Sequence, residues 1–291
     1  MENLSFGPLP DSPYCCPLCQ EALTREPGRF CCPRRHSFDI AREGYVNLLP
    51  VQKKHSLQPG DSPQMLASRR RFLERGHYHP LRQALLARFQ PLGVARLLDL
   101  GAGEGWYCGW LQQELADQQH LPEVYGIDIS KSAIQMAAKR YPDCSFSVGS
   151  THDLPFADQG FSHALNVFAP LKASEAARVL APRGMLLRVS PAAGHLFELK
   201  TLLYVQAREH AAETSEIAGF SLISQERLSS PFCLTSPDEL RELIQMTPYA
   251  WKLQTEPAHL LERAVPLTVR LDVWLSLYQK PSETVANLRR R

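Results

Sequence analysis

Two closely spaced pairs of zinc-binding residue types near the N-terminus constrain this chain of 291 residues most strongly. Two residues separate Cys16 from Cys19, twelve follow, and three separate Cys32 from His36, which gives the pattern C-x2-C-x12-C-x3-H. Structural zinc takes four sulfur or nitrogen ligands in a tetrahedron, and each tight pair can supply two of them. We therefore predict one structural zinc ion per chain, bound by Cys16, Cys19, Cys32 and His36.

Two further cysteines, Cys15 and Cys31, adjoin the predicted ligands and are alternatives to them. We prefer Cys16 and Cys32 because each begins a Cys-Pro turn with short spacing to the next ligand. A segment of this length is too short to form a core of its own, so a metal is the expected source of its stability. We assign residues 1–50 to this zinc-binding module, 51–95 to a linker and helical segment that leads into the core, and 96–291 to a larger second domain.

The composition excludes several classes of protein. With 44% hydrophobic and 21% charged residues the chain is not disordered, and no apolar run reaches the ~18 residues of a membrane-spanning helix. The N-terminus lacks the apolar segment of a signal peptide, so we expect a cytoplasmic protein, where clustered cysteines favour metal binding over disulfides. A net charge of +2 does not indicate a general nucleic-acid binder, and we expect neither a membrane nor a DNA partner.

Strand and helix patterns alternate through the second half of the chain. Helical spacing covers residues 64–91 with a break at 76–80, and the lengths of the elements that follow favour a doubly wound α/β sheet of parallel strands. We predict strands at 96–100, 123–127, 145–149, 161–167, 185–189 and 265–277, and helices at 106–119, 131–141, 196–210 and 236–246.

The first of these strands runs into a glycine-rich loop that predicts a cofactor site. Gly101, Gly103 and Gly105 form G-x-G-x-G, but a dinucleotide fingerprint would have another glycine where Trp106 stands. The acidic Glu104 also disfavours a pyrophosphate. A cofactor with an amino group and no phosphates fits better, which indicates S-adenosylmethionine.

Acidic and polar residues end the next two predicted strands. Asp128 follows the second strand, where its carboxylate can accept hydrogen bonds from the ribose hydroxyls of the cofactor. Ser150 and Thr151 follow the third strand, in a loop that resembles the adenine-side loop of class I methyltransferases. Many of those enzymes have an acid where this chain has Ser150, so we expect the adenine contact from Ser150, Thr151 or the backbone.

Several segments together resemble the bacterial 23S rRNA (guanine-N1)-methyltransferase family. Besides the cysteine module and the glycine loop, the resemblance rests on segments spread over nearly the whole chain, at residues 36–49, 59–62, 69–72, 76–81, 137–142, 169–170, 195–200 and 246–251.

This resemblance implies a Rossmann-like class I methyltransferase domain that transfers a methyl group from S-adenosylmethionine to N1 of a guanine in a hairpin of 23S rRNA. It places the zinc on the same four ligands predicted above. It places cofactor contacts at Tyr78, Gly103, Glu104 and His195, and it implies a homodimer.

The target guanine must be unpaired or flipped out, because N1 lies on its Watson–Crick edge. Asn166 and Phe168 end the fourth predicted strand, and we expect Phe168 to stack on the base and Asn166 to contact its edge. No sequence feature identifies the group that accepts the N1 proton. Asp153 and His77 are weak candidates.

The cysteine module also carries an excess of basic residues, seven against three acids over residues 25–54. Arg34 and Arg35 lie within the second ligand pair, so we expect them to bind RNA phosphates. Two other functions are open. A small-molecule methyltransferase would leave the module and its arginines without a role, and a non-catalytic zinc-dependent rRNA-binding factor would leave the glycine loop unexplained.

Overall fold

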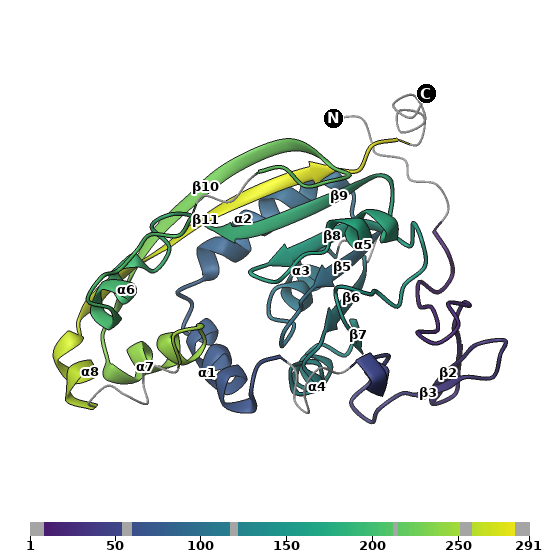
Figure 1. The fold of residues 1–291 in the computed structure, drawn as a ribbon, viewed down its shortest axis with the longest axis horizontal. Helices are drawn as coiled ribbons and strands as arrows, with labels where there is room; N and C mark the ends of the chain where they lie inside the picture. The colour runs from purple at the N-terminus through teal and green to yellow at the C-terminus, as the bar shows by residue number, and fades with distance from the viewer. Residues whose placement is uncertain (1–8, 54–59, 117–121, 212–214, 251–257, 283–291) are drawn as a thin grey trace.

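The chain is organised around one eight-stranded sheet in the order β10-β11-β9-β8-β5-β6-β7-β4 (Figure 1). The computed structural model describes residues 9–53, 60–116, 122–211, 215–250 and 258–282. Residues 54–59 of the predicted linker lie outside this range. The strands are β4 (Val46–Asn47), β5 (Arg96–Leu100), β6 (Glu123–Asp128), β7 (Ser145–Val148), β8 (Phe161–Val167), β9 (Leu180–Pro191), β10 (Ser221–Leu234) and β11 (Leu267–Gln279).

The predicted α/β class is confirmed, but the sheet is mixed rather than wholly parallel. Neighbouring strands from β9 to β4 are parallel, whereas β11 is antiparallel to both β9 and β10. The sequence analysis missed β10 entirely. This strand lies at the edge of the sheet, and its first half is almost wholly exposed. Only its second half, from Arg227 to Leu234, alternates between exposed and less exposed residues, so the sequence shows an incomplete strand pattern.

The predicted helices exist, and several are shorter than expected. The helical segment divides at Gly76 as predicted, but the helices expected at 106–119 and 196–210 end at Leu115 and Leu203. The α-helices are α1 (Pro63–Glu74), α2 (His79–Phe89), α3 (Cys108–Leu115), α4 (Lys131–Arg140), α5 (Ala173–Val179), α6 (Phe197–Leu203), α7 (Pro237–Gln245) and α8 (Ala258–Ala264), with 3-10 turns at Val51–Lys53 and Gln90–Leu92.

Serine caps fix where three helices begin. The hydroxyls of Ser62, Ser130 and Ser236 accept hydrogen bonds from the backbone N–H groups at the starts of α1, α4 and α7. These caps satisfy donors that the first turn of a helix cannot pair internally.

The N-terminal module packs directly on the edge of the large sheet. Its own small sheet consists of β1 (Thr24–Glu26), β2 (Arg29–Cys31) and β3 (Ser37–Asp39). The chain then enters the large sheet as β4, which pairs with β7. The ring of Tyr14 stacks on Phe156 at 5.2 Å, in a shared core with residues of β5 and β6. The boundary predicted at residue 50 therefore falls after a strand that already belongs to the large sheet.

Helices that could cross a bilayer are absent from the described part of the chain. In Figure 1 the cysteine module lies at one end of the molecule, and α1, α7 and α8 lie at the other, below the end of the long strands β10 and β11.

Candidate functional site

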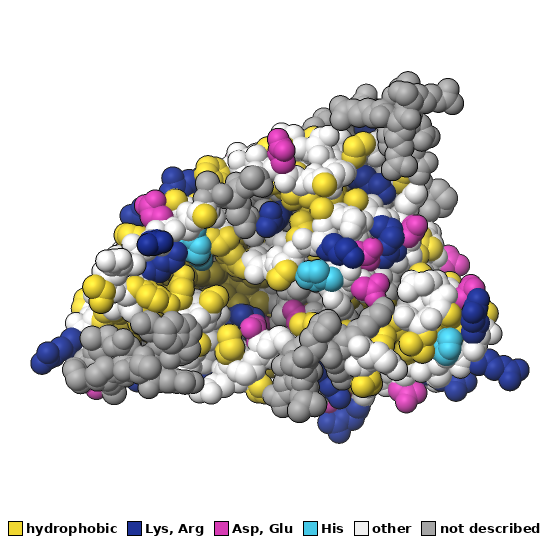
Figure 2. All heavy atoms as spheres, in the orientation of Figure 1, with side chains coloured by type: hydrophobic (Ala, Val, Ile, Leu, Met, Phe, Trp, Pro, Cys, Tyr) yellow, Lys and Arg dark blue, Asp and Glu magenta, His cyan; other side chains and the backbone are white. Residues whose placement is uncertain are grey.

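A cavity of about 930 Å³ opens at the carboxyl ends of β5, β6, β8 and β9. Figure 2 shows the hollow, with hydrophobic side chains on its walls. Its volume is within the range of ~300–1,000 Å³ that is usual for cofactor sites, and this edge of a parallel sheet is where such folds bind ligands. The lining comes from the glycine loop, Asp128 and Ile129, residues 167–170, the end of β9 with His195 and His210, the first helical segment, and residues 246–249.

The glycine loop forms one wall because its backbone turns in ways that side chains would prevent. Gly101 and Gly103 both adopt positive φ, at 86° and 55°. A Cβ at Gly101 would overlap the Cβ of Ala169 on the neighbouring strand end. Only glycine therefore allows the loop to approach this closely and leave its backbone open to a ligand.

Asp128 lies at the end of β6 beside this loop and lines the cavity. Its two carboxylate oxygens accept hydrogen bonds from the backbone N–H groups of Gly103, at 3.0 Å, and Ser130, at 2.8 Å. Burial raises the pKa of Asp128 above its ordinary value. Each oxygen can accept a second hydrogen bond, so the carboxylate remains able to bind two hydroxyl groups.

A charged cluster adjoins Asp128. Arg69 of α1 approaches Asp61 at 2.5 Å and Glu104 of the loop at 3.9 Å. Burial raises the pKa of Glu104, and within the described residues its Oε1 atom has no hydrogen-bond partner. A buried carboxylate oxygen without a donor suits a ligand that brings its own, such as the amino group of S-adenosylmethionine. The residues present fit this cofactor.

Aromatic side chains line other parts of the cavity, among them Phe168, His195 and Tyr78. The ring of Phe168 stacks on His195, with centroids 5.3 Å apart, and is 41% exposed. Burial lowers the pKa of His195 to about 3, and the nearby His210 adds to this effect, so the His195 imidazole is neutral at pH 7. Tyr78 lines the cavity from the break between α1 and α2 and is almost fully buried.

Six predicted site residues do not line this cavity. The side chain of Asn166 is fully buried and donates a hydrogen bond to the carbonyl of Leu100 at 3.0 Å, so it links β8 to β5. The prediction that Asn166 contacts the target base is corrected accordingly. Outside the lining as well are Gly105, Ser150, Thr151, His77 and Asp153. A Cβ at Gly105 would meet core side chains instead, at 3.0 Å from Phe146.

The reasons differ among these residues. The hydroxyl of Ser150 accepts a hydrogen bond from the backbone N–H of His152, within the turn that follows β7. His77 is directed away from the cavity, stacking on Phe232 at 4.9 Å and facing Glu239 of α7. Neither His77 nor Asp153 is therefore placed to accept a proton from a base in the cavity.

The sequence analysis missed several residues of the lining. Asp61 and Arg69 come from the segment between β4 and β5, and residues 246–249 come from the connection between β10 and β11. Both stretches belong to segments that carry the family resemblance. That resemblance was the only signal available for them, because tertiary folding alone brings them to the glycine loop.

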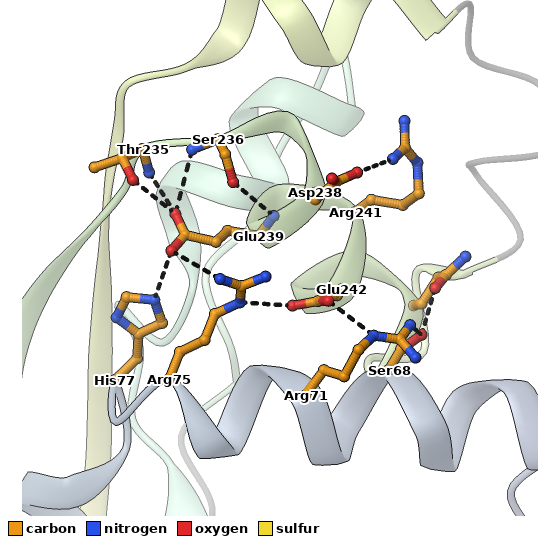
Figure 3. Close-up of polar contacts among 11 residues, drawn as sticks. Ser68, Arg71, Arg75, His77, Thr235, Ser236, Asp238, Glu239, Arg241 and Glu242 are labelled. Atoms are coloured by element: carbon orange, nitrogen blue, oxygen red, sulfur yellow. Dashed lines mark hydrogen bonds and ion pairs between the residues drawn. The ribbon is translucent and has the colours of Figure 1, made fainter.

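Helix α1 contains the lining residue Arg69, and α7 leads into lining residues 246–249. A network of charges joins the two helices (Figure 3). The Glu242 carboxylate of α7 accepts hydrogen bonds from the Nε atoms of Arg71, at 2.9 Å, and Arg75, at 2.8 Å. Glu239 closes a capping box with Ser236 and also lies 3.6 Å from Arg75. The network fixes α7 against α1 on the side of the cavity opposite the sheet.

The predicted zinc ligands converge in the N-terminal module. The ligand atoms of Cys16, Cys19, Cys32 and His36 all lie within 4.8 Å of one another. The His36 Nδ1 atom is 3.4 Å from the sulfurs of Cys16 and Cys32, and the sulfurs of Cys19 and Cys32 are 3.6 Å apart.

These distances match a tetrahedral zinc site. Zn–S bonds of ~2.3 Å and Zn–N bonds of ~2.0 Å place two sulfurs about 3.8 Å apart, and sulfur and nitrogen about 3.5 Å apart. The residues fit one zinc ion with four protein ligands and no open position, which is the arrangement of a structural site. Cys15 and Cys31 lie outside this cluster.

Both candidate RNA-binding arginines of the module are exposed. Arg34 lies 3.9 Å from Glu21, and Arg35 adopts a positive φ of 64° in the turn between the ligands Cys32 and His36. The turn thus presents two guanidinium groups to solvent beside the metal site.

Comparison with known proteins accounts for both parts of the chain. Residues 14–57 match the family model for the N-terminal zinc ribbon of RlmA, and residues 97–184 match a methyltransferase domain model. The 23S rRNA (guanine(748)-N(1))-methyltransferase of Streptomyces fradiae is 33% identical over 271 residues, which cover 90% of this chain and 93% of the relative. This chain belongs to the 23S rRNA (guanine-N1)-methyltransferase family.

Two further members of the family match over similar lengths. A relative from Micromonospora griseorubida, described as a 23S rRNA (guanine-N(1)-)-methyltransferase, is 36% identical, covering 91% of this chain and 96% of the relative. A relative of the same description from Bacillus subtilis is 30% identical, covering 91% and 97%. The resemblance inferred from the sequence is confirmed. The chain is a class I methyltransferase with S-adenosylmethionine as cofactor and a structural zinc ribbon.

Proposed function

We propose that this protein methylates N1 of a guanine in a hairpin of 23S rRNA. The observation that carries the proposal is the match to guanine-N1 methyltransferases over nine tenths of the chain, through both the zinc ribbon and the cavity. S-adenosylmethionine supplies the methyl group when it is bound beside the glycine loop.

The exposed ring at the cavity supports a flipped base as the acceptor. Phe168 adopts a φ of 53° and rests on the buried, neutral ring of His195. A ring held in this way offers a rigid stacking surface for an unpaired base, whereas a base still in a duplex could not reach the cavity. We assign Phe168 to stacking on the guanine.

Cofactor contacts are assigned to residues that line the cavity. We assign Asp128 to the ribose hydroxyls, Glu104 to the amino group, and Tyr78 and His195 to the walls around the cofactor. Ser150 and Thr151 lie outside the lining, so their proposed role at the adenine has no support from this arrangement.

The zinc ribbon supports RNA as the substrate class. The zinc holds the backbone of the turn that carries Arg34 and Arg35, which places both guanidinium groups on the outer surface of the module. Such groups suit phosphates of a folded RNA. We further propose that the protein acts in the cytoplasm as a homodimer.

Transfer of a labelled methyl group tests the activity. The purified protein is incubated with labelled S-adenosylmethionine and, in separate reactions, 23S rRNA, 16S rRNA, duplex DNA and a lipid extract. We expect label in 23S rRNA alone, and a stop of reverse transcription one nucleotide before a single guanine, because a methyl group on N1 blocks base pairing. Label in the lipid extract, or a methylated base without such a stop, would contradict the proposal.

A further inference from the structure

We propose that Arg69 binds the α-carboxylate of S-adenosylmethionine and so selects the intact cofactor over its decarboxylated form. The proposal rests on the assignment of this cofactor to the cavity. Arg69 is a binding residue here and takes no part in the transfer of the methyl group.

The charges of the cavity call for such a residue. The cofactor carries two positive centres, the sulfonium and the ammonium, and a single carboxylate. The described lining contains four acidic side chains, which suit the positive centres but disfavour that carboxylate: Asp61, Asp99, Glu104 and Asp128. Burial raises the pKa of Asp99 to about 7, so this side chain is only partly charged at neutral pH. An anion can bind among them only where a cation compensates for their charge.

The described lining contains two arginines, Arg69 and Arg188, and their positions differ. Arg69 lies against the glycine loop itself, because a Cβ built on Gly103 would be 3.6 Å from its Nη1 atom. Arg188 belongs to β9, which is separated by β8 from the strand that leads into the loop. The amino acid end of the cofactor has its partner for the ammonium at Glu104, so the adjacent Arg69 is the cation within reach of the carboxylate.

The surroundings of Arg69 keep its charge and its position. Its side chain is only 25% exposed, and Nη1 lies 2.5 Å from Asp61 and 3.9 Å from Glu104. Burial by itself would lower the pKa of Arg69, but Asp61 and Glu104 more than offset that effect and raise it. A planar guanidinium can also bind a carboxylate through two parallel N–H groups, which a lysine cannot do.

Binding measurements with two cofactors test this inference without any turnover. Calorimetric titrations compare S-adenosylmethionine and decarboxylated S-adenosylmethionine on the wild type, Arg69→Met, Arg69→Lys and Arg188→Met. Arg70→Met is the matched control, because Arg70 is the next residue of α1 and pairs with Glu74 on the outer surface. Thermal unfolding of each variant establishes that it is folded.

We expect Arg69→Met to weaken binding of S-adenosylmethionine about 10- to 100-fold, the range for a hydrogen bond to a charged group. Binding of the decarboxylated cofactor should stay the same or tighten. This cofactor has only positive charges, so removal of the Arg69 cation increases its attraction to the acidic side chains of the cavity. Arg69→Lys should weaken binding of S-adenosylmethionine less than Arg69→Met does. Arg70→Met and Arg188→Met should prefer S-adenosylmethionine over the decarboxylated cofactor as strongly as the wild type does.

Equal losses for both cofactors in Arg69→Met would mean that Arg69 only holds the cavity together, and the proposal would be wrong. If Arg188→Met instead lost the preference for S-adenosylmethionine over the decarboxylated cofactor, Arg188 of β9 would be the residue that binds the carboxylate. That result would also overturn the proposal. A folded wild type that binds neither cofactor would contradict the cofactor assignment itself, which is a separate failure.

Discussion

The carboxylate of Glu242 and the guanidinium of Arg75 join two helices that are 167 residues apart in the sequence, through a hydrogen bond of 2.8 Å. Arg75 immediately follows α1, whose Arg69 lines the cavity, and Glu242 belongs to α7, which leads into lining residues 246–249. One buried carboxylate therefore helps to set the position of two walls of the site.

The pH dependence of this link gives a first prediction. Burial would raise the pKa of Glu242, but hydrogen bonds from Arg75 and Arg71 more than offset that effect, so the pKa is lowered. A carboxyl with a lowered folded-state pKa stabilises the protein above its unfolded pKa of ~4.3, and this contribution is lost as the pH falls through the folded-state value. Glu242→Gln should cost about 1 kcal/mol at pH 7 and close to nothing below the folded-state pKa.

Urea denaturation of both proteins over a range of pH measures this difference. Asp238→Asn is the control, because Asp238 pairs with Arg241 on the same helix but is 75% exposed, so its loss should cost less than about 0.5 kcal/mol. A cost for Glu242→Gln that does not change with pH would show that the charge of Glu242 is not what stabilises the pair.

The zinc site gives a second prediction. Cys19→Ser should abolish zinc binding and lower the stability of the whole protein, because the ribbon shares its core with the large sheet through Tyr14 and β4. Metal analysis should find about one zinc per wild-type chain. Cys31→Ser is the control and should keep its zinc, since Cys31 lies outside the ligand cluster. Undiminished zinc in Cys19→Ser would overturn the assignment of ligands.

A third prediction concerns the ribose contact. Asp128→Ala should weaken binding of S-adenosylmethionine by about 1.5–3 kcal/mol, through lost hydrogen bonds to the cofactor and a less constrained Gly103. Calorimetry on Asp128→Ala and on Asp153→Asn makes the comparison, because Asp153 follows a neighbouring strand but lies outside the cavity. If both variants bind as tightly as the wild type, Asp128 does not contact the cofactor.

The stacking surface gives a fourth prediction. Phe168→Ala should lower kcat/KM for rRNA about 10- to 100-fold, equivalent to ~1–3 kcal/mol for the stacking of one base, and leave cofactor affinity near the wild type. Phe168→Tyr keeps the ring and should retain most activity. Single-turnover kinetics and cofactor titrations separate the two effects. A parallel loss of cofactor affinity would place Phe168 on the cofactor side of the cavity.

Salt dependence tests the role of the zinc ribbon as a fifth prediction. The double variant Arg34→Ala and Arg35→Ala should bind rRNA more weakly, with the slope of log affinity against log salt reduced by about one unit or less per lost contact. Arg241→Ala, which removes a partly exposed arginine from α7, far from the zinc site in the sequence, is the control. Identical slopes and affinities for the double variant and the wild type would mean that these arginines do not contact RNA.

Local patterns in the sequence determined the zinc ligands and the glycine loop. The ligands Cys16 and Cys19 lie on one tight turn, so their spacing alone implies a metal, and the zinc ribbon match agrees with it. The glycine loop is equally local, because its positive φ angles favour glycine in any surroundings. Its close approach to Ala169 is a tertiary contact that adds to this requirement. The class of fold followed from the alternation of strand and helix patterns. Parallel strands are connected by helices that cover both faces of the sheet, so this alternation is visible in the sequence.

Tertiary structure alone decided which residues meet around the cavity and which do not. Asn166 and Phe168 are two residues apart at the end of one strand, yet Asn166 is buried against β5 and Phe168 faces the cavity with a positive φ. Arg69 reaches the glycine loop only because α1 packs against α7, where Glu242 binds Arg71 and Arg75. Such contacts join segments far apart in the sequence, and their geometry depends on how whole helices pack, which no local pattern of residues encodes.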